Sequence, residues 1–292
     1  MKVEDFYSEI HKRYGNITRA RGPFLYTQKN VRLTDLNQEG GRAILGWDAP
    51  SYTVFKNVMT KGLVGSFDCA YRGQLQRAVS ELLNSKRKIS FFCHKKDAMQ
   101  AALVLDPKST SVFKPFSGVD YSGVKNVIIA PPLPWTNNFW ILAANGLGKD
   151  KDSRVERGND SAENGGLERG QNVIAGLERG QNVIAGLDPA ILPSEKFPPA
   201  LIAAAARAVY DLIAAIKVRQ EKDFFIYDKV LTKFFERRSC WLRPKVPQEK
   251  YDDFVLACLD AGVLVNPDYN ADSLVPFGAD KGVLKKMGEI NV

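Results

Sequence analysis

Hydrophobic and polar positions in residues 1–140 alternate between the two-residue period of strands and the longer period of helices. The first helix-like segment opens the chain and carries charges of both signs. Strands are predicted at 25–26, 31–33, 89–93 and 124–130, a hairpin turn at 27–30, and further helices at 71–83 and 97–105. Alternating β and α elements indicate an α/β layer structure.

A more helical pattern occupies the C-terminal third of the chain. Pro198 and Pro199 precede an alanine-rich helix, because proline costs little at the first helical position. Helices are predicted at 200–218, 224–235, 248–261 and 280–287, and a short strand at 263–265. Gly262 follows the third of these helices and marks its end. This part is expected to form an α+β module.

A polar, glycine-rich stretch separates the two parts. The decapeptide GLERGQNVIA at 166–175 is repeated without change at 176–185. Two copies are too few for a solenoid, since stacked repeats need about three units to bury a common core. We therefore predict three regions: 1–144 as an N-terminal segment and reduced large domain, 145–187 as an insert, and 188–292 as a small C-terminal domain.

The composition adds a moderate excess of positive charge, with 41 lysines and arginines against 33 acidic residues. Such an excess suits anions, yet the basic residues come in short groups without a nucleic-acid-binding motif, so nucleic acid is not expected as a partner. No apolar run is long enough for a membrane span, and the charged N-terminus does not resemble a secretory signal, so a cytoplasmic protein is expected. The four cysteines are far apart in the sequence and only two histidines are present, so no metal site is expected.

The segment from Ala20 to Pro50, ARGPFLYTQKNVRLTDLNQEGGRAILGWDAP, resembles the N-terminal segment of class III aminotransferases, especially the glutamate-1-semialdehyde aminomutase type. That family has a hairpin, a glycine-rich turn and an I-L-G-H-x-x-P motif in the same order. Near the other end, LDAGVLVNPDYNADSLVPFGADKGVLKKM is similar to the family's last strand and helix, and PPALIAAAARAVYDLI to its G-N-P-L-A-M-A-A helix. The resemblance implies an α/β fold of the type I pyridoxal phosphate class, here shortened.

In that family a turn of the form N-S-G-T-E-A holds the cofactor phosphate at a helix N-terminus, with a glycine and hydroxyl donors. The resemblance places this turn on residues 93–98, where His94, Lys95 and Lys96 become the candidate phosphate ligands. Lys95 stands where the family has glycine, and its side chain hinders close approach of the backbone to a phosphate. Altered or lost phosphate binding is therefore expected.

The resemblance assigns further positions around the cofactor. Phe116 would stack on its ring, and Ser194 would reach a phosphate in a dimer partner, although simple packing and a structural role stay open for them. The aspartate that keeps the pyridine nitrogen protonated is replaced by Ala130-Pro131-Pro132. Residues 142–148, where the Schiff-base lysine should stand, contain no lysine, so Lys149 is the nearest candidate, with a solvated lysine as the plainer interpretation.

The leading hypothesis is a non-catalytic or repurposed aminotransferase relative, without a bound cofactor and with no small-molecule ligand identified. It is expected to form a homodimer, with Trp135, Phe139 and Trp140 serving either as contact surface or as core. One alternative is a pyridoxal phosphate enzyme, an aminotransferase or aminomutase, with Lys149 or Lys125 as a displaced lysine. Another is a basic module that binds nucleic acid or another anion.

Overall fold

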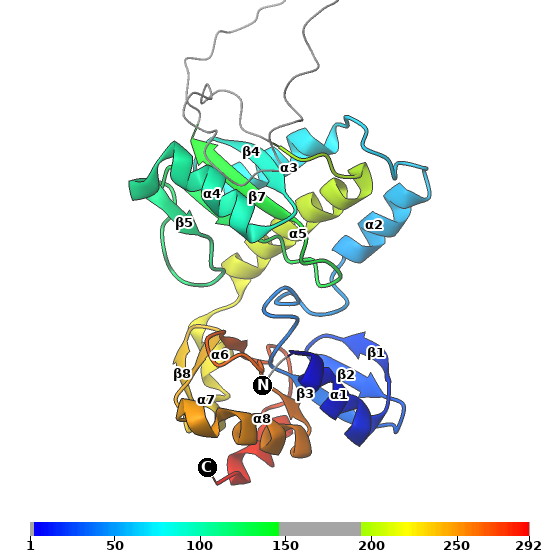
Figure 1. Ribbon diagram of the computed structural model, residues 1–292, viewed down its shortest axis with the longest axis vertical. Helices are drawn as coiled ribbons and strands as arrows, with labels where there is room; N and C mark the ends of the chain where they lie inside the picture. Colours follow the sequence, from blue (N-terminus) through cyan, green and yellow to red (C-terminus); the bar gives the residue numbers. More distant parts are fainter. Residues whose placement is uncertain (1–2, 146–193, 292) are drawn as a thin grey trace, which may run out of the picture.

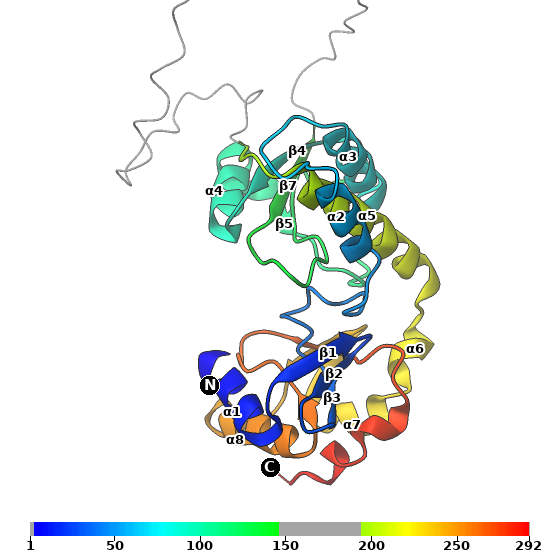
Figure 2. The same cartoon turned by 90° about the vertical axis from the view of Figure 1, so that its right-hand side faces the viewer.

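The computed structural model describes residues 3–145 and 194–291, which form two lobes (Figure 1). The upper lobe in Figure 1 holds residues 51–145 and 199–218. The lower lobe is built from both ends of the described chain, residues 3–48 and 221–291. Two stretches of chain join the lobes, one before residue 51 and one after residue 218 (Figure 2).

The upper lobe is built on a four-stranded sheet in the order β4-β7-β6-β5. Its strands are β4 (Arg87–Phe92), β5 (Thr110–Val112), β6 (Asn126–Ile129) and β7 (Trp140–Asn145). β7 runs antiparallel to β4 and to β6, whereas β5 runs parallel to β6. The last residues of β4, β5 and β6 therefore meet the first residue of β7 at one edge, which we call the carboxyl edge. Its strand residues are Phe92, Val112, Ile129 and Trp140.

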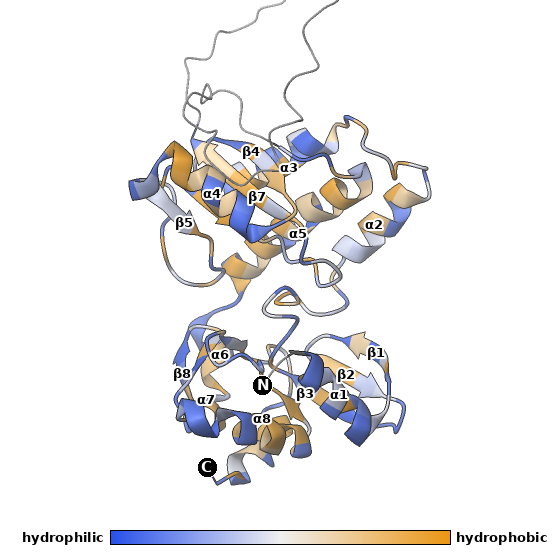
Figure 3. Cartoon of the chain, viewed as in Figure 1, coloured by the Kyte–Doolittle hydropathy of each residue, from blue (hydrophilic) through white to orange (hydrophobic). Residues whose placement is uncertain are grey.

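Helices cover both faces of this sheet. They are α2 (Ser51–Met59), α3 (Tyr71–Leu82), α4 (Lys95–Leu105) and α5 (Pro199–Val218), with a 3-10 turn at Pro107–Ser109. α3 and α5 share a core with one face of the sheet, which includes Leu75 and Phe91. α4 packs on the other face through Ala98 and Ala102, and α2 packs on α5. Hydrophobic residues dominate α5 and β7 because both lie between other layers (Figure 3).

The lower lobe contains two small sheets. The first, in the order β1-β2-β3-β10, consists of β1 (Ile17–Arg21), β2 (Phe24–Thr27), β3 (Arg32–Asp35) and β10 (Val263–Leu264). The second, in the order β11-β9-β8, consists of β8 (Phe235–Arg238), β9 (Trp241–Pro244) and β11 (Ser273–Leu274). The helices are α1 (Val3–Tyr14), α6 (Glu221–Phe225), α7 (Asp228–Leu231) and α8 (Tyr251–Asp260), with 3-10 turns at Gln248–Lys250, Lys281–Leu284 and Met287–Glu289. α1 and α8 lie on the same side of the first sheet (Figure 2), where Phe6, Leu33 and Phe254 belong to one core.

A buried arginine fixes the loop that leads into β6. Arg87 of β4 is 1% exposed and donates hydrogen bonds to the carbonyls of residues 121, 122, 124 and 125 at 2.6–3.3 Å. No ion pair within the described residues involves its guanidinium, so these carbonyls replace its hydration. The loop 121–125 is consequently held against the start of the sheet.

Most predicted elements are confirmed. The hairpin appears as β2 and β3, and Asn30 in its turn adopts a left-handed φ of 59°. The helices expected at 71–83, 97–105 and 200–218 appear as α3, α4 and α5, with Pro199 at the start of α5. α8 ends before Gly262, whose φ of 79° suits a helix terminus.

The predicted helix at 224–235 is wrong. This range contains the short helices α6 and α7, and Phe235 begins β8, where it pairs with Pro244. Its aromatic residues have helical spacing, but the hairpin of β8 and β9 turns them into the core of the lower lobe. The helix predicted at 280–287 is formed by two 3-10 turns instead of one α-helix.

The lobes group the segments differently from the division predicted at residues 144 and 188. Residues 3–48 share a core with residues 224–290, so the N-terminal segment and the C-terminal part form one lobe. α5 packs against α3 and the upper sheet, which puts it in the same lobe as residues 51–145. The predicted insert lies outside the described residues except for Asn145. No helix in residues 3–145 or 194–291 is long and apolar enough to cross a membrane.

Candidate functional site

The carboxyl edge of the upper sheet contacts the lower lobe directly. Trp241 of β9 donates its Nε1–H to the carbonyl of Pro115 at 2.7 Å. Arg42 donates from Nη2 to the carbonyl of Asn137 at 3.0 Å. Pro115 follows β5 and Asn137 precedes β7, so both acceptors lie at this edge. Any group bound at the edge must therefore fit beside side chains of the lower lobe.

The turn between β4 and α4 exposes three of the predicted phosphate ligands. His94 precedes α4 with an extended backbone, φ −121° and ψ 142°, and its side chain makes no capping hydrogen bond. The side chains of His94, Lys95 and Lys96 are all exposed. The Lys95 ammonium lies 5.8 Å from the ring centroid of Trp140. The turn offers positive charge but no glycine at the position where the family has one.

Residues 194–195 run beside β4 and reach the same turn. The Oγ of Ser194 accepts a hydrogen bond from the Phe91 N–H at 3.1 Å, and the Glu195 N–H donates to the Phe91 carbonyl at 2.9 Å. The Glu195 carboxylate accepts from the Cys93 N–H at 3.0 Å. Ser194 thus bonds to a strand of its own chain, and its predicted contact with a partner's phosphate stays a prediction. A carboxylate already binds the first amide of the turn.

Glu195 also affects the thiol that starts the turn. Burial, together with the hydrogen bond and negative charge of Glu195, raises the pKa of Cys93 to about 11. The thiol is therefore protonated at neutral pH and is a poor nucleophile. His94 has an extended backbone, and side chains of adjacent residues on an extended chain point to opposite sides.

Phe116 lies between the lobes and its ring is already in contact. Its centroid is 5.8 Å from that of Phe224 in an edge-to-face arrangement, and the Arg219 guanidinium carbon lies 5.6 Å from it. The same guanidinium lies 3.9 Å from the ring of Phe277 and donates to the carbonyl of Ile44 at 2.8 Å. These contacts favour the packing role for Phe116 over stacking on a cofactor.

Lys114 is a residue at this edge that the sequence did not single out. Its ammonium forms an ion pair with Asp272 of the lower lobe and lies 4.6 Å from the ring centroid of Trp241. Lys114 and Asp272 are 158 positions apart, so no local pattern could have predicted the pair. The lysine is engaged in a contact between the lobes.

Arg42 is a second residue that sequence reasoning missed. It is 8% exposed, its guanidinium carbon lies 4.9 Å from the ring centroid of Trp140, and burial lowers its pKa to about 10. Its Nη1 is buried without a hydrogen-bond partner among the described residues. The local sequence feature that could have drawn attention to Arg42 is the Gly40-Gly41 turn before it. Glycine at position 41 lets the backbone lie close to the ring of Trp241.

Of the positions that the resemblance assigns to the cofactor's nitrogen and aldehyde, only the first lies wholly within the described residues. β6 is followed by Ala130 and then by buried prolines, without a carboxylate. Lys149 lies outside the described residues. Lys125 precedes β6, so it lies at the opposite edge of the sheet, where its ammonium is 2.8 Å from a carboxylate oxygen of Asp106.

The described residues therefore do not fit pyridoxal phosphate. The phosphate turn lacks glycine and has one amide bound to Glu195, the end of β6 lacks an acid, and Lys114 is paired. A dianionic phosphate beside Glu195 would also meet a like charge, which disfavours binding. No cluster of three or more metal-ligating side chains occurs in residues 3–145 and 194–291.

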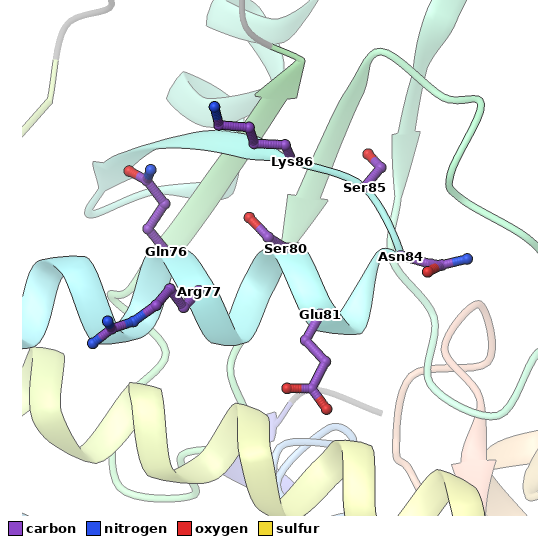
Figure 4. Close-up of a pocket in the computed structure, with 7 residues that line it drawn as sticks. All are labelled: Gln76, Arg77, Ser80, Glu81, Asn84, Ser85 and Lys86. Atoms are coloured by element: carbon purple, nitrogen blue, oxygen red, sulfur yellow. The ribbon is translucent and has the colours of Figure 1, made fainter. Parts of the chain in front are cut away.

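Two hollows lie in the upper lobe, and the second is lined by residues that reach the turn after β4. One of about 480 Å³ is an open groove along the end of α3, at the edge opposite to the carboxyl edge. Its polar side chains spread apart, with Glu81 and Asn84 pointing away from Lys86 (Figure 4). A smaller hollow of about 140 Å³ lies beside Ser194, between Arg72 and Phe197. The smaller hollow is also lined by Asp68, Cys69 and Glu195, and the carboxylate of Glu195 accepts the Cys93 N–H.

Phe139 and the tryptophans near it have different surroundings. Phe139 is fully buried, with its ring centroid 4.7 Å from that of Phe197, so core packing is the right interpretation for it. The ring of Trp140 packs against the guanidinium of Arg42. Trp135 is 37% exposed and contacts Tyr52 and Phe55 of α2.

Comparison with known proteins links this chain to one fold. No family model matches the sequence. An uncharacterised protein of Treponema pallidum is 24% identical over 306 residues, covering 94% of this chain and 93% of that protein. The ornithine aminotransferase of Plasmodium yoelii has a TM-score of 0.60 at 12% identity, with 99% of this chain and 97% of that chain covered. Serine palmitoyltransferase of S. paucimobilis, solved with bound PLP-myriocin aldimine, has a TM-score of 0.56 at 10% identity, with 98% and 95% covered. The chain therefore has the mixed α/β fold of these enzymes, as the resemblance implied.

Proposed function

We propose that this protein is a shortened, aminotransferase-like scaffold that does not carry out transamination. The fold shared with an ornithine aminotransferase supports the aminotransferase-like scaffold, and the shortening is inferred from the sequence. The hydrogen bond from the Cys93 N–H to the Glu195 carboxylate carries the second half of the proposal, the absence of transamination. Cys93 lies two positions before the first residue of α4, so the carboxylate stands beside the turn, where its negative charge disfavours a bound phosphate dianion.

The contact between the lobes supports the same conclusion. Phe116 is enclosed by Phe224 and Arg219, and Trp241 closes over Lys114. Phe224 and Trp241 belong to the lower lobe and Arg219 to the stretch that joins the lobes, so the carboxyl edge is in contact with residues from outside the upper lobe. Interactions already satisfied within the chain have to be broken before a ligand can use the same groups.

A cofactor-binding experiment tests the proposal. The purified protein is mixed with pyridoxal phosphate, its visible absorbance is recorded, and the mixture is reduced with borohydride and mapped by mass spectrometry. We expect no absorbance change beyond that of free cofactor and no lysine labelled above the level seen in urea-unfolded protein. Stoichiometric labelling of one lysine in the folded protein would overturn the proposal.

Three lysine variants identify the group if such labelling occurs. Lys149→Ala removes the candidate of the resemblance, Lys125→Ala the lysine at the opposite edge, and Lys114→Ala the lysine paired with Asp272. Loss of label in one variant only would assign an active site to that lysine and restore the enzyme hypothesis.

We also infer a homodimer in the cytoplasm, without a membrane partner. Exposed apolar side chains on and after α2 support self-association, since isolated monomers seldom expose several together. They are Tyr52, Met59, Val64 and Phe67. Sedimentation equilibrium of wild type and a Tyr52→Ser variant tests this surface, and a monomeric wild type would contradict the inference.

A further inference from the structure

One face of the β1-β2-β3 sheet carries arginines beside aromatic rings. In the strand register Arg19 pairs with Tyr26 and Tyr26 with Arg32, which makes one row across three strands. Arg21 pairs with Phe24 and Phe24 with Thr34, which makes the next row. Directly paired residues lie on the same face of a sheet. We call this the arginine-aromatic face, and its members are Arg19, Arg21, Phe24, Tyr26, Arg32 and Thr34.

The opposite face of the same strands is buried, which turns this face outward. Leu25 and Leu33 alternate with the residues of the arginine-aromatic face and belong to the core with Phe6 and Ile10 of α1. Helix α1 therefore covers the other side of the sheet (Figure 2). The three arginines are exposed and the two rings are partly exposed, whereas Thr34, next to Val263 of β10, is buried. Phe24 also packs against the core, so the exposed part of the face is centred on Arg19, Tyr26 and Arg32.

The contacts within the face pair cations with rings. The guanidinium carbon of Arg19 lies 5.4 Å from the ring centroid of Tyr26, and that of Arg32 lies 4.5 Å from that of Phe24. Arg21 is 3.4 Å from a carboxylate oxygen of Asp48. For Arg19 and Arg32 the described part of the chain offers no carboxylate within ion-pair distance. Their charge is consequently left for an external anion.

We propose that the arginine-aromatic face binds single-stranded nucleic acid. Bases stack on aromatic rings and on guanidinium planes, and arginine side chains bind phosphates in a planar, bidentate manner. Phe24 and Tyr26 are two positions apart on one strand, about 7 Å along the sheet, which suits two successive bases of an extended strand. Aromatic rings can stack only on bases that are free of a duplex stack, which favours a single strand over a duplex.

This inference does not depend on the proposed function. The face lies in the lower lobe and uses none of the residues at the carboxyl edge. The sequence did not indicate it because Arg19, Arg21 and Arg32 belong to no basic cluster, and only the register of the hairpin brings them together.

Fluorescence anisotropy with a labelled oligothymidylate of about 12 nucleotides tests the proposal in the full-length protein. At about 50 mM salt we expect binding that weakens steeply as salt is raised. Arg19→Gln and Arg32→Gln should each weaken binding and reduce the slope of log K against log salt by about 0.7. Tyr26→Leu, which keeps an apolar side chain but no flat ring, should weaken binding roughly tenfold. An abasic oligonucleotide of the same length should bind more weakly than oligothymidylate.

A matched control separates this face from general positive charge. The side chain of Arg238 is 81% exposed and pairs with Glu236, and its strand β8 lies on the opposite side of the lower lobe from β1 in Figure 1. Arg238→Gln should leave the affinity unchanged. No binding by the wild type at low salt, equal loss in Arg238→Gln, or equal binding of the abasic strand would each overturn the proposal. Loss of a wild-type dimer in Arg19→Gln, without nucleic-acid binding, would assign the face to self-association instead.

Discussion

Glu195 binds the backbone N–H of Cys93 with a carboxylate oxygen at 3.0 Å, at the turn between β4 and α4. The two residues are 102 positions apart, and the bond joins the segment before α5 to the end of a core strand. It explains both the blocked amide of the turn and part of the raised pKa of the Cys93 thiol.

Replacing Glu195 with glutamine should make Cys93 more reactive. The substitution removes a negative charge beside the thiol, so the pKa of Cys93 should fall from its value of about 11 towards that of an ordinary thiol. Alkylation with iodoacetamide at pH 9, followed peptide by peptide, should then be faster at Cys93. Glu81→Gln, a change at an exposed glutamate of α3, serves as the control. An unchanged rate at Cys93 would mean that burial alone sets its pKa.

Two glycines should respond in opposite ways to replacement by alanine. Gly41 has a φ of 93°, and an added Cβ would lie 3.2 Å from a ring carbon of Trp241, so Gly41→Ala should destabilise the fold by about 1 kcal/mol or more. Gly73 lies within α3 with open space around it, so Gly73→Ala should stabilise by about 0.5–1 kcal/mol. Urea unfolding of both variants measures the difference. A neutral Gly41→Ala would show that Trp241 moves away at no cost.

The sequence predicted those elements whose signal is local. The apolar spacing of α3 and the proline start of α5 depend on residues within one helix, and both predictions are confirmed. β8 was missed because Phe234 and Phe235 fit a helical period, while pairing of Phe235 with Pro244 decides the structure. Strand pairing depends on a partner that periodicity does not contain.

The difference between local and distant signals also explains which parts of the candidate site could be predicted from the sequence. The resemblance led to the turn of His94 and Lys95, because a strand followed by a helix can be recognised locally. It could not reveal that Glu195 would bind this turn, or that Lys114 would pair with Asp272, because both contacts join distant segments. Contacts of this kind depend on how the lobes pack.

Arg87 should be among the least replaceable residues of the upper lobe. Arg87→Leu would leave the carbonyls of residues 122 and 124 without a donor and would remove one of two donors from those of residues 121 and 125. The cost is about 1–3 kcal/mol for each unpaired carbonyl that water cannot reach. We expect a loss larger than about 3 kcal/mol or a failure to fold. Arg87→Lys, which keeps three donors, should lose less. Lys88→Leu, at the exposed neighbouring position of β4, should change stability by less than about 0.5 kcal/mol. Similar stability of Arg87→Leu and wild type would contradict this role.

Because the carboxyl of Asp35 is buried, the free energy of unfolding should fall as pH rises from about 4 to about 6. Burial raises the pKa of this carboxyl to about 6, although hydrogen bonds from the Gln38 N–H and from Trp47 Nε1–H lower it. Between the unfolded value of about 3.9 and the folded one, the folded state holds a proton that the unfolded state releases, so the free energy of unfolding falls as pH rises. The fall should amount to at most about 3 kcal/mol.

Comparing variants isolates this contribution from that of other carboxylates. In Asp35→Asn the fall between pH 4 and 6 should disappear relative to wild type, whatever its absolute stability, because no group titrates at that position. Trp47→Phe removes a hydrogen bond that favours the charged carboxylate, so it should raise the pKa of Asp35 and extend the fall to higher pH. Glu39, whose negative charge also raises the pKa of Asp35, stays unchanged in both variants. Chemical denaturation across this pH range measures the effect, and parallel pH curves for wild type and Asp35→Asn would show that Asp35 does not titrate there.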